Sequence, residues 1–182
     1  MQTAHCYETY PLWIPLVANG LSLAIYLLGV LIAAHGGALP AGVYVVYCLW
    51  MEWRLLRKSC AECYYYGKRC AFGKGIVCAW ILSPGDPQNR PKPEITWRLF
   101  LPDLLVLIIP MVLGLIFLFR DFSWTLLAMM AGMLLLAFPA NGYVRENLAC
   151  PFCKKRETGC AAVEFFEKMR KEKNPPQANG GQ

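Results

Sequence analysis

The sequence has few charged residues and very few histidines. Only 16% of its 182 residues are Asp, Glu, Lys or Arg, whereas soluble domains usually carry about a quarter. Long windows are almost free of charge, so the composition predicts a membrane protein. The two histidines, His5 and His35, are predicted at opposite faces of the membrane. This placement argues against a haem held by two histidines within the bilayer.

The apolar windows also lack acids and bases near their middle. Intramembrane ionisable residues mark ion and proton pathways, but Glu52 and Asp103 fall at the ends of their predicted helices. A pump or ion-coupled transporter is therefore not indicated. No nucleophile–histidine–acid constellation of the kind that hydrolases use is present. We therefore do not expect an enzyme that acts alone, and a non-catalytic subunit of a redox complex fits better.

Four apolar runs predict four transmembrane helices arranged as two helical hairpins. The first run is long enough to cross a hydrocarbon core of ~30 Å at ~1.5 Å per residue. The second run is the weakest, because Glu52 and Arg54 lie near its end. Asn141-Gly142 predicts the end of the fourth helix, since glycine commonly follows a helix C-terminus. The predicted runs are 12–34 and 41–56 in the first hairpin (1–56), and 99–119 and 122–139 in the second (99–143).

A polar stretch follows each hairpin. Residues 57–98 are predicted to form a cysteine-rich loop with a proline-rich linker. Residues 144–182 are predicted to hold further cysteines, a short amphipathic helix around 163–169 and a disordered tail. The apolar segment 76–82 is too short to span, and we expect it either to lie on the membrane surface or to cover the cysteines. The predicted fold class is an all-α membrane protein, a four-transmembrane-helix bundle with cytoplasmic cysteine-rich loops.

Basic residues predict the orientation of the bundle. Both polar stretches are rich in Lys and Arg, whereas the opposite side carries only Arg120. The positive-inside rule assigns the basic side to the cytoplasm. We therefore expect a multi-pass protein of the cell (inner, cytoplasmic) membrane with both termini in the cytoplasm. Basic loops facing anionic lipid explain the net charge of +6 without a nucleic-acid partner.

The most specific pattern is the spacing C-x2-C-x6-C, which occurs twice, 90 positions apart. A C-x-x-C pair turns two thiolates toward one ion from a tight loop. Each copy follows a predicted hairpin, so the pattern suggests an internal repeat of hairpin plus triplet. The two triplets are Cys60, Cys63 and Cys70, and Cys150, Cys153 and Cys160.

A reducing compartment makes metal ligation or thiol redox chemistry the default for these cysteines. Thiolates select zinc or iron–sulfur clusters, and the spacing does not separate the two. In one arrangement, the two C-x-x-C pairs share a single site. In the other, each triplet has its own site, with Cys78 completing the first and Cys6 or His5 completing the second. Cys48 is expected to be a buried apolar residue of a helix.

Three functions follow from this sequence. The first is an electron-transfer or accessory subunit of a membrane complex, which passes electrons between a soluble redox protein and other membrane subunits. The second is a zinc-stabilised membrane scaffold or anchor, in which the metal orders loops that are poor in core residues. The third is a thiol-based redox sensor.

Overall fold

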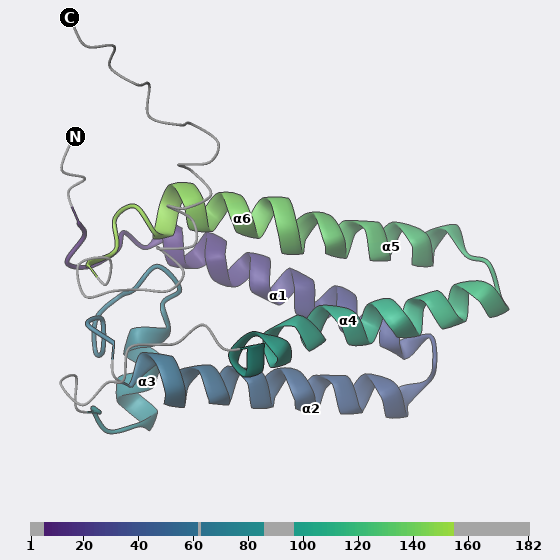
Figure 1. Ribbon diagram of the computed structural model, residues 1–182, viewed down its shortest axis with the longest axis horizontal. Helices are drawn as coiled ribbons and strands as arrows, with labels where there is room; N and C mark the ends of the chain where they lie inside the picture. Colours follow the sequence, from purple (N-terminus) through teal and green to yellow (C-terminus); the bar gives the residue numbers. More distant parts are fainter. Residues whose placement is uncertain (1–5, 62, 86–96, 155–182) are drawn as a thin grey trace, which may run out of the picture.

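The computed structural model describes residues 6–61, 63–85 and 97–154, and every regular element in these ranges is helical. The long helices lie beside one another along the long axis of the molecule (Figure 1). The loops after α2 and after the last helical run gather at one end, on the left of the view. The elements are α1 (Trp13–Ala34), α2 (Ala38–Leu55), the π-helical turn η1 (Leu56–Cys60), α3 (Lys74–Ile81), α4 (Trp97–Arg120), α5 (Trp124–Leu135), η2 (Leu136–Ala140), α6 (Asn141–Tyr143) and η3 (Val144–Ala149).

The first hairpin joins α1 to α2 through the predicted turn at 35–37. Gly37 has a φ of 104°, a region that glycine enters at no steric cost. Between the two helices, Gly29 leaves room for the ring of Tyr44. The hydroxyl of Tyr44 donates a hydrogen bond of 2.8 Å to the carbonyl of Val106. The hairpin is therefore fixed to α4 as well as closed on itself.

The second hairpin consists of α4 and a helical run that begins with α5 and passes through η2, α6 and η3. The predicted stop at Asn141-Gly142 is wrong, because this run continues to Ala149. Gly142 does not take the positive φ of a glycine that ends a helix. The side chain of Asn141 instead accepts a hydrogen bond of 3.2 Å from Nε of Arg145, one turn later. Val144 and Ala149 are buried and hold the last turns against the protein.

Two hydrophobic clusters hold the long helices together. One joins α1 to the last helical run and is built around Ile32, Leu126 and Met133. The other joins α1, α2 and α4 around Tyr44 and Val106. Apart from the tyrosines, whose hydroxyls are hydrogen-bonded, no charged or polar side chain is buried within the described ranges. The interior is therefore apolar, as expected for a bundle in which packing rather than polar chemistry positions the helices.

Three helices are long and apolar enough to cross a membrane: Trp13–Ala34, Leu101–Arg120 and Trp124–Ala149. α2 is not among them, because Glu52 and Arg54 lower the hydropathy of its last turns. The structure thus supports an all-helical protein with three candidate spans, and the fourth span stays a prediction. The predicted amphipathic helix around 163–169 and the predicted tail lie outside the described residues.

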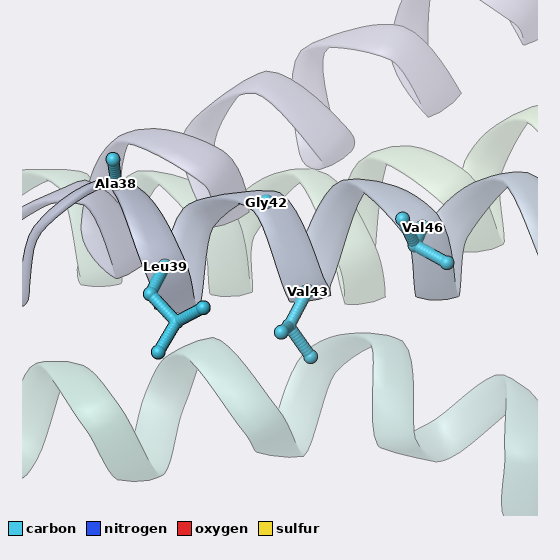
Figure 2. A pocket seen from close by; sticks show the side chains of 5 residues that line it. All are labelled: Ala38, Leu39, Gly42, Val43 and Val46. Atoms are coloured by element: carbon cyan, nitrogen blue, oxygen red, sulfur yellow. The ribbon is translucent and has the colours of Figure 1, made fainter.

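The outer side of α2 is apolar. Leu39, Val43 and Val46 project from it and are 80%, 64% and 66% exposed. Together with the small residues Ala38 and Gly42 they line a hollow of about 420 Å³ (Figure 2). An apolar outer side is what a helix in contact with lipid requires.

Candidate metal centre

The two C-x-x-C pairs have the same local structure. Each lies at the end of a π-helical turn. In the first turn, the Ala61 N–H donates to the Leu56 carbonyl at 3.1 Å, and in the second the Cys150 N–H donates to the Arg145 carbonyl at 2.9 Å. Within each pair, the N–H of the second cysteine donates to the carbonyl of the first, at 3.2 Å for Cys60–Cys63 and 3.3 Å for Cys150–Cys153. The sequence repeat is therefore also a structural repeat: a long helix, a π-turn and a C-x-x-C turn.

The loop between Cys63 and α3 is wound tightly by glycines. Gly67 and Gly73 have φ values of 72° and 66°, which other residues rarely adopt. Gly67 N–H bonds to the Gly75 carbonyl at 3.0 Å. A Cβ on Gly75 would collide with the carbonyl oxygens of Tyr65 and Lys68. The chain can return past itself at this point only because Gly75 has no side chain.

This winding brings four cysteines into one neighbourhood, which we call the first cysteine group: Cys60, Cys63, Cys70 and Cys78. Burial raises the pKa of the Cys60 thiol to about 12, with further contributions from Cys70, Cys78 and Cys63, while the Lys74 ammonium opposes them. Burial and Cys63 also raise the pKa of Cys78. The Cys78 side chain is fully buried, and its Sγ lies 3.7 Å from the carbonyl of Leu56. Without metal, both thiols keep their protons at neutral pH.

Three further cysteines surround a pair of buried tyrosines, and we call Cys6, Cys150 and Cys153 the second cysteine group. The pKa of Tyr10 is raised by burial and then by Cys153, Tyr65 and Cys150. The pKa of Tyr65 is raised to about 12, first by burial and also by Cys153 and Cys6, while the hydrogen bond from the Lys154 N–H lowers it. The electrostatic influence on the two rings thus comes from all three thiols of the second group.

Tyr10 and Tyr65 also bind together three segments that are far apart in the sequence. The rings meet edge to face with centroids 5.6 Å apart. The hydroxyl of Tyr10 donates to the Ala149 carbonyl at 2.7 Å, and that of Tyr65 donates to the Tyr7 carbonyl at 2.7 Å. The N–H of Lys154 donates to the Tyr65 hydroxyl at 3.1 Å. We call the resulting assembly of residues 6–10, 56–85 and 149–154 the cysteine layer.

The backbone and apolar contacts of the layer reinforce this arrangement. Tyr7 N–H bonds to the Phe152 carbonyl and Tyr10 N–H bonds to the Arg69 carbonyl, both at 3.0 Å. Cys63, Cys70 and Cys153 pack around one hydrophobic cluster. Cysteines of both triplets therefore share one set of neighbours.

The charges of the layer are partly paired. Glu52 of α2 accepts hydrogen bonds from the Tyr26 hydroxyl at 2.7 Å and from Lys74 Nζ. Lys154 Nζ lies 3.1 Å from a Glu8 carboxylate oxygen and 3.2 Å from the Tyr64 hydroxyl. Of the basic residues, Lys74 is the one that acts on the Cys60 thiol, and it would offset negative charge on a thiolate there.

Six of the seven predicted ligands lie in the cysteine layer. Cys160 lies outside the described residues, and the predicted bystander Cys48 is buried in α2 beside Tyr44 and Met51. Among residues 6–61, 63–85 and 97–154, no three His, Cys, Asp or Glu side chains stand close enough together to hold one metal ion. Among the described cysteines, Cys48, Cys60, Cys63, Cys70 and Cys78 are free thiols.

The role of the tyrosine pair was missed from the sequence. Tyr65 belongs to a run of three tyrosines, a pattern equally typical of shielding and of interfacial anchoring. For Tyr10, no sequence pattern beyond its position before Pro11 indicated that it would join distant segments. Comparison with known proteins adds nothing to this picture, because no family model, curated protein or solved structure matches the chain.

Proposed function

We propose that this chain is a multi-pass membrane protein that binds metal through two groups of cysteines at its cytoplasmic face. In this proposal it acts as an electron-transfer or accessory subunit of a membrane complex. The observation that carries the proposal is that cysteines of both triplets pack around one hydrophobic cluster, in a layer where hydrogen bonds join three distant segments. Clustered thiolates are the ligands that iron–sulfur clusters and zinc select.

The two-site arrangement fits the cysteine layer better than a single shared site. The thiols that act on Cys60 are those of Cys63, Cys70 and Cys78, while Cys6, Cys150 and Cys153 act on the tyrosine pair. Cys78 is then the fourth ligand of the first site. Cys6 and Cys160 join the C-x-x-C pair of the second site. The thiols of each group must rotate toward a common centre and lose their protons when the metal binds.

The fourth span of the proposed bundle is α2. Its 18 residues give a length of about 27 Å at 1.5 Å per residue, and it packs against α1 and α4. Its charged residues sit at the end that joins the cysteine layer, where Glu52 contacts Lys74 and Arg54 lies 3.9 Å from Asp103. With four spans the cysteine layer faces the basic side, which the positive-inside rule assigns to the reducing cytoplasm.

Metal analysis combined with an absorption spectrum of anaerobically purified protein tests the proposal. A brown protein whose visible absorbance bleaches on reduction supports an iron–sulfur electron-transfer role. We expect Cys63→Ser and Cys153→Ser each to lower the metal content by about half if there are two four-ligand sites. If one site is shared, either variant should lose nearly all the metal. Cys48→Ala is the matched control and should keep the full content.

Two other outcomes would replace this proposal. A colourless protein with stoichiometric zinc would identify a zinc-stabilised scaffold. The small number of buried side chains in the layer favours that candidate, because metal binding supplies folding energy that such loops lack. A metal-free protein whose triplets form disulfides reversibly would identify a thiol sensor. If neither cysteine variant changes the metal content, the metal proposal is wrong.

A further inference from the structure

The short helix α3 has two different faces. Gly75 and Cys78 are buried on the face that packs against the first cysteine group. Val77, Trp80 and Ile81 are 44%, 85% and 51% exposed. Their spacing of three and four residues puts them on one side of the helix. α3 is thus an apolar helix that buries one face in the protein and leaves Val77, Trp80 and Ile81 largely exposed on the other.

The contacts of α3 place it at the end of α2. Lys74, its first residue, reaches Glu52, and Cys78 lies against the carbonyl of Leu56. In Figure 1, α3 runs across the end of the bundle rather than along it. α3 therefore lies beside the last turns of α2, where a membrane-spanning helix would leave the hydrocarbon core.

The neighbouring surface indicates what covers this face. Trp50 and Trp53, in the last two turns of α2, are 49% and 43% exposed. Tryptophan is enriched at the level of the lipid headgroups, where its ring suits a boundary between apolar and wet surroundings. Trp80, on the helix that packs at the end of α2, is exposed as well. Arg57 and Lys58, which follow α2 directly in the chain, are exposed, as expected for a surface that faces anionic headgroups.

We propose that α3 is an interfacial helix, whose Val77–Trp80–Ile81 face lies in the headgroup layer of the phospholipid bilayer while its Cys78 face closes the first cysteine group. This inference rests on the membrane setting proposed above, but it does not depend on which metal binds. The bilayer surface then supports the loop that carries Cys60, Cys63 and Cys70, and the first metal site lies at the membrane surface.

Fluorescence quenching tests this placement directly. The full-length protein and its Trp80→Phe variant are reconstituted into vesicles of phosphatidylcholine and phosphatidylglycerol. The difference between their emission spectra is the emission of Trp80. We expect this emission to be quenched by lipids brominated on the acyl chain close to the headgroup, and only weakly by iodide in the water. Trp124→Phe is the matched control, because Trp124 is also strongly exposed but lies at the opposite end of the bundle.

Two results would overturn the proposal. Quenching of the Trp80 emission by iodide and not by brominated lipid would put this face of α3 in water. Quenching by neither would show that protein covers it, either a second copy of the chain or a partner. Metal content is measured in the same samples, and Trp80→Phe should keep the wild-type value. A metal-free wild type would therefore end the metal proposal without changing the quenching result.

Discussion

At the scale of single residues, the state of the thiols decides what the cysteine layer can do. Burial raises the pKa of Cys60, and the thiols of Cys70, Cys78 and Cys63 raise it further, so this environment stabilises the protonated form. A protonated thiol is a poor nucleophile and a poor ligand. The thiols of the metal-free layer are therefore protonated and react slowly with electrophiles. Metal binding must release their protons.

The reactivity of Cys60 in metal-free protein should follow its raised pKa. The thiol titrates near pH 12 in the folded chain, against an ordinary value of 9.0. The folded state thus binds the proton more tightly than the unfolded state. The resulting stabilisation is complete below about pH 9 and is lost as the pH rises toward 12. We expect iodoacetamide to modify Cys60 slowly at pH 9, as measured by mass spectrometry of its peptide.

The same residue in denatured protein is the control for that experiment. Once unfolded, Cys60 should be alkylated at pH 9 at the rate of an ordinary thiol. Equal rates in folded and denatured protein would contradict the protected environment that we describe. Bound metal should block the reaction over the whole pH range in which it stays bound.

At the scale of elements, glycine positions decide how closely helices approach. Gly29 and Gly20 both lie in α1, and their surroundings differ. A Cβ on Gly29 would come within 2.6 Å of Cζ of Tyr44, whereas nothing lies within 4 Å of a Cβ on Gly20. Tyr44 is held in place by its hydrogen bond to Val106. The ring therefore cannot move aside without leaving a buried hydroxyl unpaired.

These two glycines give a matched pair of substitutions. Gly29→Ala should destabilise the bundle by about 1–3 kcal/mol, because it overpacks the contact between α1 and α2. Gly20→Ala should be neutral or stabilising by up to about 1 kcal/mol, because alanine has the higher helix propensity. Thermal unfolding of the purified variants in one detergent measures both effects. A melting temperature of Gly29→Ala at or above the wild type would refute this packing.

At the scale of the whole molecule, the question is whether α2 crosses the membrane. If it does, the turn at 35–37 and the loop between Cys63 and α3 lie on opposite sides of the membrane. A recognition site for a specific protease is inserted into the turn in one variant and into the loop in another. The site in the turn should be cut only in right-side-out vesicles, and the site in the loop only in inside-out vesicles. Cleavage of both sites from the same side would show that α2 does not span the membrane. Among the four predicted spans, α2 is the one to test, because its short length and its charged residues make it the weakest candidate.

The membrane character and the order of elements followed from sequence. Apolar runs of about 20 residues leave few alternatives to helices, because the backbone of a spanning segment must satisfy its own hydrogen bonds. The predicted breaks after residues 34 and 119, which separate the apolar runs of each hairpin, both occur in the structure to within one residue. The end of the last helical run was not predicted correctly, because the buried contacts of Val144 and Ala149 outweigh the local stop signal of Asn141-Gly142.

The sequence by itself determined the helical class, the two C-x-x-C turns and their shared position after long helices. Each of these depends on residues close together in the chain. Only the tertiary structure decided which cysteines are neighbours, because that depends on contacts between distant segments. Gly75 lets the chain pass back under Tyr65, which brings Cys78 to Cys60. The pair Tyr10 and Tyr65 ties the first loop to the N-terminal segment and to Ala149, which brings both Cys6 and Cys153 toward Tyr65.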